Sequence, residues 1–245
     1  MIRDLLAGAH FFLSGFGLIR QRGLRRYALM PVLINILVFG VLLYAGVIGM
    51  ESLLSGWLPG GDSWWAQLLR ALAWLVFGAA AAALVFFGFT VAANLIGAPF
   101  NARLSERTEQ LLRGSSANAG QVSLFREIGY ASAHESRKLL YFAVRALPLW
   151  LLTLVPGVNL LAGPLWVLFT AWYMGMEYFD YPLSAHHRPF RELLAESRKY
   201  RALLSGFGLA AMAALMVPVM NLLVMPAAVA GATAMWVARY GQDDK

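Results

Sequence analysis

Hydrophobic residues gather in four long blocks along the chain, and polar segments separate them. The blocks cover residues 28–49, 71–100, 139–176 and 203–238. A bilayer core takes roughly 20 helical residues, so the first block predicts one long transmembrane helix. The second predicts another, which we expect to continue beyond the bilayer as a cytoplasmic extension and to cover 71–113 in all. The last two blocks are too long for one crossing, because a helix rises about 1.5 Å per residue.

Both of these longer blocks carry a proline near the middle, inside a repeated pattern. The pattern Val-Pro-x-x-Asn-Leu-Leu-x-x-Pro occurs at 155–164 and again at 217–226. A Glu-Ser-Arg-Lys tetrapeptide precedes each copy, at 135–138 and at 196–199. Proline disrupts a helix interior, so the chain can reverse there and form two shorter helices per block. The sequence therefore predicts two re-entrant, half-penetrating helix hairpins that form an internal repeat.

Basic residues lie almost entirely on one predicted side of the membrane. Of the 20 Lys and Arg, 5 lie in 1–27, 6 in 101–138, 5 in 177–202 and 2 after residue 238. If the last two blocks each crossed once, the basic residues of 177–202 would face outward, against the positive-inside tendency. Hairpins place every basic cluster on the same side. We expect both termini in the cytoplasm.

Composition agrees with this topology and excludes several kinds of chemistry. Hydrophobic residues make up 60% of the 245 residues and charged residues 13%, against about 45 to 50% and about 25% in soluble domains. With no linker-like tract, residues 1–245 are predicted to form a single membrane domain of an all-α integral membrane protein. The chain has no cysteine, which excludes disulfides and thiol catalysis. Nucleotide-binding, nucleophile and metalloprotease motifs are absent, so we expect no enzyme, no cofactor and no metal site.

Polar residues form a narrow stripe along the second predicted helix at about 100° per residue. The stripe consists of Thr90, Asn94, Asn101, Ser105 and Thr108. Such side chains commonly hydrogen-bond between membrane helices, but they could also form one wall of a hydrated path. Asn159 and Asn221 carry a similar ambiguity, because an Asn beside a buried chain reversal can satisfy free backbone groups.

A glycine followed by two arginines, Gly23-Leu24-Arg25-Arg26, precedes the first block. One interpretation is a basic anchor at the lipid surface. The other is an anion site, because glycine lets the backbone approach a ligand closely and guanidinium groups are fork-shaped donors. A site made only of donors would suit sulfate better than phosphate, whose proton requires an acceptor.

Two further groups of charges lie near or inside the blocks. Arg103, Glu106 and Arg107 follow the second predicted span; they are either a solvated ion-pair surface or the mouth of an anion path. Arg145 lies inside the third block, where a charge is costly unless the side chain reaches back to the interface.

The sequence resembles the CysZ sulfate permeases of bacteria over nearly its whole length. The matching stretches are 23–26, Asn-Leu-Ile-Gly-Ala-Pro-Phe-Asn at 94–101, Glu-Tyr-x-Asp-Tyr-Pro at 177–182, and the run from Asn221 to Thr233. This resemblance implies sulfate uptake across the bacterial inner membrane for cysteine biosynthesis, a fold of two long spans with half-penetrating helix pairs, and homo-oligomers. The implied partners are sulfate, membrane lipid and further copies of the chain, with no nucleic acid.

The resemblance also implies the residues that handle sulfate. Gly23, Leu24 and Arg25, with Arg26 adjacent, are the expected sulfate-binding residues. Candidates for the translocation path are Asn94, Asn101, Arg103, Glu106, Arg107, Asn159 and Asn221. Position 103 departs from the family pattern, because a small or apolar residue is expected there.

Several alternatives stay open at this stage. The chain could be a channel-like or a proton-coupled permease. If the predicted topology holds, Arg25 and Arg26 lie on the exit side, so they could capture substrate or sense internal sulfate. An alternative of another class is a non-transporting membrane scaffold or accessory subunit whose basic surfaces bind anionic lipid.

Overall fold

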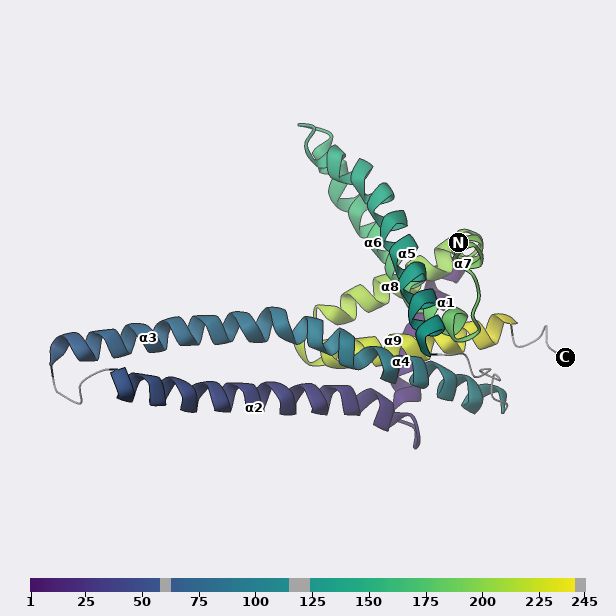
Figure 1. Cartoon of the computed structure of the whole chain (residues 1–245). Helices are drawn as coiled ribbons and strands as arrows, with labels where there is room; N and C mark the ends of the chain where they lie inside the picture. Colours follow the sequence, from purple (N-terminus) through teal and green to yellow (C-terminus); the bar gives the residue numbers. More distant parts are fainter. Residues whose placement is uncertain (58–62, 115–123, 241–245) are drawn as a thin grey trace. The chain divides into compact units, whose positions relative to one another are not determined.

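The structure is a computed structural model that describes residues 1–57, 63–114 and 124–240, without the side chains at 86, 89–96, 98, 124–133, 218 and 219. The described chain is entirely helical between its turns (Figure 1), which confirms the predicted all-α class. The elements are α1 (Ile2–Ile19), α2 (Arg25–Trp57), α3 (Trp64–Ala83), the π-helical turn η1 (Leu84–Gly88), α4 (Phe89–Arg113), α5 (Leu124–Thr153), α6 (Asn159–Ala185), α7 (Phe190–Lys199), α8 (Arg201–Leu215) and α9 (Pro218–Tyr240).

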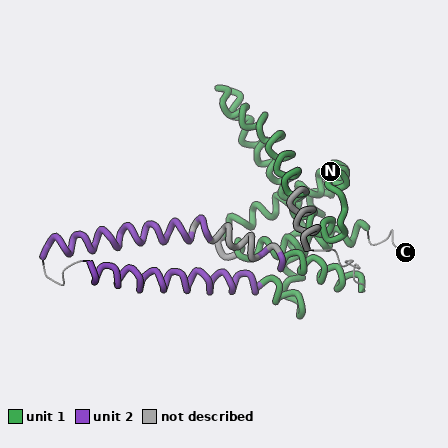
Figure 2. Tube along the Cα trace, in the orientation of Figure 1, with its two compact units in different colours: residues 1–28, 101–245 green, residues 29–100 purple. Residues whose placement is uncertain are grey.

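The contacts divide the chain into two compact units (Figure 2). One unit, residues 29–100, contains most of α2, all of α3 and the start of α4. A side-chain atom added at Gly46 would lie 3.2 Å from the Phe77 ring, and one at Gly88 would lie 3.6 Å from the Phe39 ring. These two contacts pair α2 with α3–η1 in opposite directions.

The two predicted long spans correspond to helices that lie mainly in this unit. The predicted span 28–49 lies within α2, and 71–113 corresponds to a helical run from α3 through η1 to the end of α4. Within the residues that the structure describes, four helices could cross a membrane by length and composition: α1, α2, α3 and residues 220–240 of α9. The windows in α2 and α3 are 11% and 6% buried, so these two helices expose their apolar side chains.

The four-block description of the sequence missed α1. Its 18 residues are apolar enough to be a candidate span, but their mean hydropathy of 1.3 is well below the 2.5 of α2. Arg3, Asp4 and His10 interrupt the apolar run. In the sequence we consider this part of the chain only for its basic residues, and the structure adds a helix there.

The third and fourth blocks each contain two helices. Residues 154–158 separate α5 from α6, with Gly157 at φ +83°, and residues 216–217 separate α8 from α9, whose first residue is Pro218. The predicted hairpins 139–176 and 203–238 thus correspond to helix pairs with breaks at the expected prolines. Their re-entrance into a bilayer stays a prediction.

The two Glu-Ser-Arg-Lys copies fold differently, and the internal repeat also stays a prediction. The first copy lies inside the continuous helix α5, whereas the second ends α7 at Lys199. Tyr200, at φ −110° and ψ 34°, breaks the helix before α8 begins.

The other unit, residues 1–28 and 101–245, is held together by close helix crossings. Each crossing has a glycine on both helices. A methyl group on Gly8 of α1 would overlap the Leu203 carbonyl oxygen of α8, and one on Gly206 of α8 would overlap that of Leu5. Such reciprocal contacts also join α6 to α8 through Gly175 and Gly208, and α1 to α9 through Gly15 and Gly231.

Larger side chains fill the space beside these crossings. Phe12 of α1 and Phe207 of α8 are both fully buried, and their ring centroids are 5.6 Å apart. Met176 of α6 and Met235 of α9 lie in the same core. Small residues that bring backbones together, with large residues around them, are typical of helix packing in membranes.

We predict that Gly8→Ala destabilises the protein and that Gly17→Ala does not. Overpacking a tight contact costs about 1–3 kcal/mol, and the added methyl at Gly8 would meet the backbone of α8. Gly17 lies in the same helix with nothing within 4 Å of the added atom, so it is the matched control. Thermal unfolding of both variants in detergent measures the difference. Equal midpoints would show that the α1–α8 crossing is looser than described.

Candidate functional site

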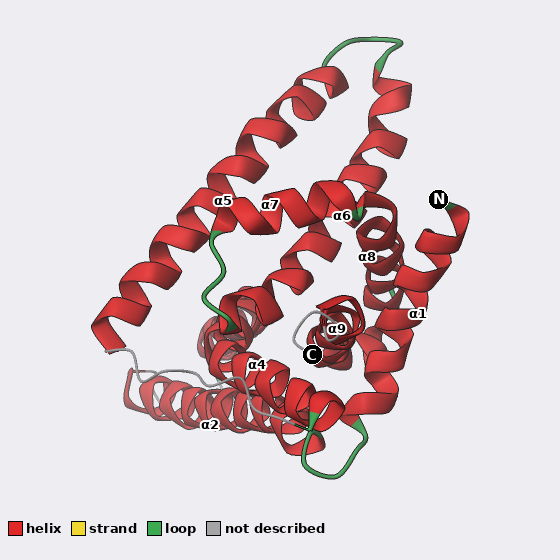
Figure 3. Ribbon diagram, turned by 90° about the vertical axis from the view of Figure 1, so that its right-hand side faces the viewer, coloured by secondary structure: helices red, strands yellow, loops and turns green. Residues whose placement is uncertain are grey.

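The turn between α1 and α2 carries the Gly-Leu-Arg-Arg sequence (Figure 3). Leu24 is 2% exposed and packs in a core with Leu104 of α4 and Ala227 of α9. Gly23 has φ +103°, and a side-chain atom added there would meet nothing within 4 Å. The turn therefore needs glycine for its backbone conformation and not for space. Leu24 anchors the turn to the core.

This turn exposes hydrogen-bond donors. Arg25 and Arg26 are exposed at the first turn of α2. In the described part of the chain, the backbone amides of Arg22 and Gly23 donate no hydrogen bond to another backbone group. Consecutive free amides beside a residue in the left-handed conformation form a concave anion-binding feature. The turn thus has the donor chemistry expected for an oxyanion.

Arg107, from a distant part of the sequence, lies beside this turn. Arg26 Nη2 donates to the Tyr27 hydroxyl at 3.0 Å, and the guanidinium of Arg107 on α4 lies beside the same hydroxyl. Arg107 Nη1 also donates to Gln110 Oε1 at 2.8 Å. We call Arg26, Tyr27, Arg107 and Gln110 the Arg26–Arg107 cluster. Sequence analysis predicted Arg26 and Arg107 as separate features, and the structure brings them together.

The other predicted path residues of α4 have different surroundings. Arg103 is exposed and Glu106 is half-buried. Asn101 is 3% exposed, and its amide lies beside the Tyr181 hydroxyl of α6. The Asn94 side chain lies outside the described residues. The structure therefore places Asn101 inside the core and Arg103 on the surface.

Part of the polar stripe joins helices, as in the first of its two interpretations. Ser105 Oγ lies 2.9 Å from Thr233 Oγ1 of α9, and both side chains are buried. The Thr108 hydroxyl donates to the Leu104 carbonyl oxygen in its own helix at 2.7 Å, and Thr108 is fully buried. Ser105 and Thr108 thus pack between α4 and its neighbours and do not face water.

Asn159 and Asn221 lie at corresponding places at the starts of α6 and α9. The backbone amide of Asn159 donates to the Val155 carbonyl at 3.0 Å, and that of Asn221 to the Val217 carbonyl at 2.9 Å. Both side chains are exposed.

Arg145 extends back along α5. Its guanidinium carbon lies 3.7 Å from the Tyr141 ring centroid, one turn nearer the N-terminus of the helix. Long helical side chains commonly lean in this direction. The contact favours the interpretation that the charge reaches back from the apolar block, which is typical of snorkelling arginines.

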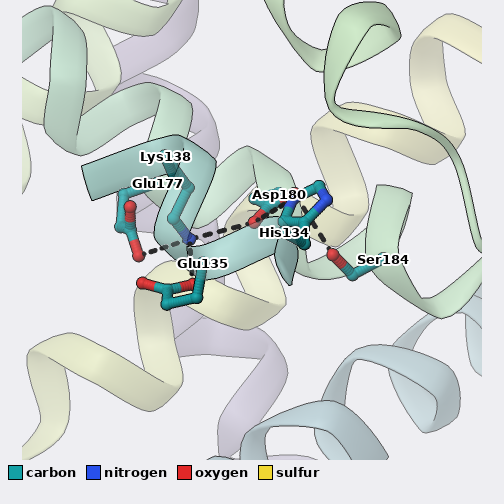
Figure 4. A network of polar contacts seen from close by, with 6 residues as sticks. All are labelled: His134, Glu135, Lys138, Glu177, Asp180 and Ser184. Atoms are coloured by element: carbon teal, nitrogen blue, oxygen red, sulfur yellow. Dashed lines mark hydrogen bonds and ion pairs between the residues drawn. The ribbon is translucent and has the colours of Figure 1, made fainter. Parts of the chain in front are cut away.

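A buried polar cluster on α5 and α6, missed in the sequence, flanks the predicted hairpin 139–176 (Figure 4). Lys138 Nζ, on a residue 3% exposed, lies 2.8 Å from Glu177 Oε1, 3.0 Å from Asp180 Oδ2 and 3.0 Å from Glu135 Oε2. His134 Nε2 lies 3.0 Å from Asp180 Oδ1, and Ser184 Oγ donates to the same oxygen at 3.2 Å. We call these six residues the Lys138 cluster.

Opposite charges in this cluster stabilise one another despite burial. Burial disfavours the charged ammonium, but Asp180 and Glu177 outweigh it and raise the pKa of Lys138 above its ordinary value. Burial also disfavours the Asp180 carboxylate, but the His134 hydrogen bond and the Lys138 charge outweigh it and lower that pKa. Both groups are therefore charged at neutral pH. Lys138 lies before the apolar block 139–176, and Glu177 and Asp180 lie after it. Charged residues at both ends of an apolar block are too common a pattern to predict such a cluster.

A second buried carboxylate connects α4 with the end of α6. Glu109 is 3% exposed and pairs with Arg113 Nε, four residues further along α4, at 3.2 Å. Its other oxygen lies 2.9 Å from His186 Nε2. The His186 ring lies 5.5 Å from that of Trp236 on α9. Contacts of this kind, between residues 77 positions apart, leave no local sequence pattern.

Comparison with known proteins agrees with the resemblance in the sequence. A family described as "Sulfate transporter CysZ/Etoposide-induced protein 2.4" matches residues 11–226. The protein named sulfate transporter CysZ from Pseudomonas aeruginosa strain LESB58 is 40% identical over 97% of both chains. The proteins of that name from Pseudomonas syringae pv. tomato and Vibrio parahaemolyticus are 39% and 35% identical over at least 94% of each chain. The chain therefore belongs to the sulfate transporter CysZ/etoposide-induced protein 2.4 family.

Proposed function

We propose that this protein takes up sulfate across the bacterial inner membrane and supplies sulfur for cysteine biosynthesis. Relatives named sulfate transporter CysZ match nearly the whole chain at 35 to 40% identity. Several helices are long and apolar enough to cross a bilayer. The sequence has no nucleotide-binding motif. Uphill transport would therefore depend on an ion gradient, a partner, or consumption of sulfate inside the cell.

The Arg26–Arg107 cluster is the observation that carries this proposal. Sulfate is a dianion that accepts hydrogen bonds and donates none, so its site needs converging donors. Exposed Arg25 and Arg26, the free amides of the Gly23 turn and the nearby Arg107 supply such donors. Charge-assisted hydrogen bonds from arginine are among the strongest in proteins. Gly23 to Arg26 form the binding site in this proposal, with Leu24 as the anchor of its backbone.

The proposed path continues along α4 from this site. Arg103 and Glu106 lie on the same helix as Arg107, on its exposed or half-buried sides. Asn94 and Asn101 extend the path toward the apolar block, and Asn159 and Asn221 are candidates at the hairpin turns. Whether sulfate passes by a channel-like or a proton-coupled route is decided by the flux experiment below.

We propose the topology that the distribution of basic residues favours. The helix pairs α5–α6 and α8–α9 enter the bilayer as hairpins and return, and both termini lie in the cytoplasm. The exposed apolar side chains of α2 and α3 face lipid or a further copy of the chain in a homo-oligomer. Non-helical backbone at the hairpin turns is tolerated at depth only where protein or water covers it, which favours an oligomer.

We predict that Arg25→Ala/Arg26→Ala greatly reduces sulfate flux. Losing a hydrogen bond to a charged group costs about 1.5–3 kcal/mol, so we expect a loss of about tenfold or more. The measurement is radiolabelled sulfate uptake into liposomes that contain only this protein, with and without a pH gradient. Arg191→Ala/Arg198→Ala, which changes two exposed arginines of α7, is the matched control.

The outcomes of this experiment separate the alternatives. Flux without a gradient indicates a channel-like route, and flux that requires the gradient indicates proton coupling. Unrestrained uptake by the variant at high internal sulfate would indicate sensing instead of capture. Absence of flux in correctly inserted protein would contradict an autonomous permease and support the accessory subunit.

We also predict that Gly23→Ala weakens sulfate binding, because a residue with a Cβ resists the left-handed backbone at about 1–2 kcal/mol. Gly17→Ala has the same chemistry at an open helical position and serves as the control. Isothermal titration of sulfate into both purified variants measures the effect. Unchanged affinity in Gly23→Ala would show that sulfate binding does not depend on the left-handed backbone conformation at Gly23.

A further inference from the structure

Hairpin α5–α6 is joined at its base by an ion pair between a buried lysine and a partly exposed glutamate. Lys138 immediately precedes the apolar block 139–176 and Glu177 immediately follows it, and their charged atoms are 2.8 Å apart. Asp180 and His134 extend the connection one turn further. Among the described elements, α5 has substantial contacts only with α6 and α7, whereas α6 also packs on α8 and α9. The Lys138 cluster is therefore the main polar attachment of α5.

The segment of α6 that carries this cluster also contacts α4. Glu177 and Asp180 face α5, while Tyr181 lies beside Asn101 of α4. One and a half turns further, His186 pairs with Glu109 of α4 at 2.9 Å. Residues 177–186 therefore connect α5 on one side with the helix that carries Arg107 on the other.

The carboxylates of this cluster depend on Lys138 to compensate their negative charge. Three carboxylates lie within 3.0 Å of its ammonium group, and two of them belong to α6. Removing one partner of a buried ion pair is strongly destabilising, because the remaining charge loses its compensation. Without Lys138, the negative charges of Glu177 and Asp180 would repel each other and attract water into the base of the hairpin.

We propose that Lys138 is a positioning residue for the transport path: it holds α5 against α6 and keeps water out of residues 177–186, which lie beside Asn101 and Glu109 of α4. The proposal rests on the proposed function, because α4 carries the Arg107 of the suggested sulfate site. Lys138 does not contact sulfate in this proposal. Its role is to hold α5 against α6 at the base of the hairpin, beside the path.

The pH dependence of a Lys138→Met variant distinguishes this role from simple packing. The groups that act on Glu177 are Lys138 and Glu135 of α5 and Asp180 of α6, with the phenols of Tyr173, Tyr178 and Tyr181 nearby. The neighbouring helices contribute the Phe190 ring of α7, edge-on to His134, and the Leu204 backbone of α8, against Gly175. Burial already raises the pKa of Glu177 more than Lys138 lowers it.

Loss of the ammonium removes a charge that lowers the pKa of both carboxyl groups, so the pKa of Glu177 rises further and that of Asp180 rises from its lowered value. Protonation as the pH falls then reduces the negative charge that disrupts the hairpin base. We expect the flux of Lys138→Met, relative to the wild type at the same pH, to be about tenfold lower at pH 8 and to recover at pH 6. A packing defect would give the same ratio at both pH values.

A labelling experiment tests the access of water to position 101 of α4 directly. The chain has no cysteine, so Asn101→Cys provides a single thiol at a buried position. We expect slow labelling by a water-soluble maleimide in this background and about tenfold faster labelling after Lys138→Met. Lys199→Met, the same change at an exposed lysine, is the control and should leave the rate unchanged. Lys138→Met/Asp180→Asn also removes the repulsion between Asp180 and Glu177, so it should label more slowly than Lys138→Met alone.

Unchanged labelling in Lys138→Met would overturn the proposal. If that variant does not fold, Asp180→Asn alone decides. This change keeps the pair between Lys138 and Glu177 and removes the contact between Lys138 and Asp180. It should label faster, and an unchanged rate would again overturn the proposal. The flux of Arg25→Ala/Arg26→Ala tests the sulfate site separately. Wild-type flux there would reject the site, while the labelling rates would still decide the role of Lys138.

Discussion

Close contact between helices α1, α6, α8 and α9 is the constraint on which the larger unit depends. Lipid tails are as apolar as the side chains, so the hydrophobic effect adds little to helix association in a bilayer. Backbones must approach closely to gain dispersion energy. The reciprocal glycines at each crossing permit that approach, and Phe12, Phe207 and Met176 fill the space around them. The turn that carries Gly23 is held against this framework by Leu24.

Buried charged and hydrogen-bonding groups attach the less tightly packed elements to this framework. Lys138 connects α5 to α6, and Glu109 connects α4 to the end of α6 through His186. Both lie at the ends of apolar segments, where a charge can be buried among partners without entering the bilayer centre. Buried pairs contribute little net stability, but any arrangement that buries one partner without the other is strongly disfavoured. They are therefore suited to fixing the relative positions of helices.

The proposed sulfate site uses the same framework for a different purpose. Arg26 and Arg107 meet at Tyr27, although one begins α2 and the other lies in the last turns of α4. Two guanidinium groups beside one phenol repel each other, and a bound dianion would relieve that repulsion. The neutral hydrogen-bonding partners Tyr27 and Gln110 hold these groups without neutralising them. Their charge thus stays available to an anion.

The sequence by itself determined the helical class, the helical runs at 28–49 and 71–113, the helix breaks near Pro156 and Pro218, and the donor-rich turn at Gly23. Each of these follows from local properties: the length of an apolar run, the missing amide hydrogen of proline, or adjacent side chains of known chemistry. The resemblance in its motifs was enough to identify the family. Only the tertiary structure decided that α1 belongs to the core, that Ser105 bonds Thr233, and that Lys138 and Asp180 share a buried cluster. These features depend on which helices cross and at what distance, and residues 42 or 128 positions apart carry no local signal of that.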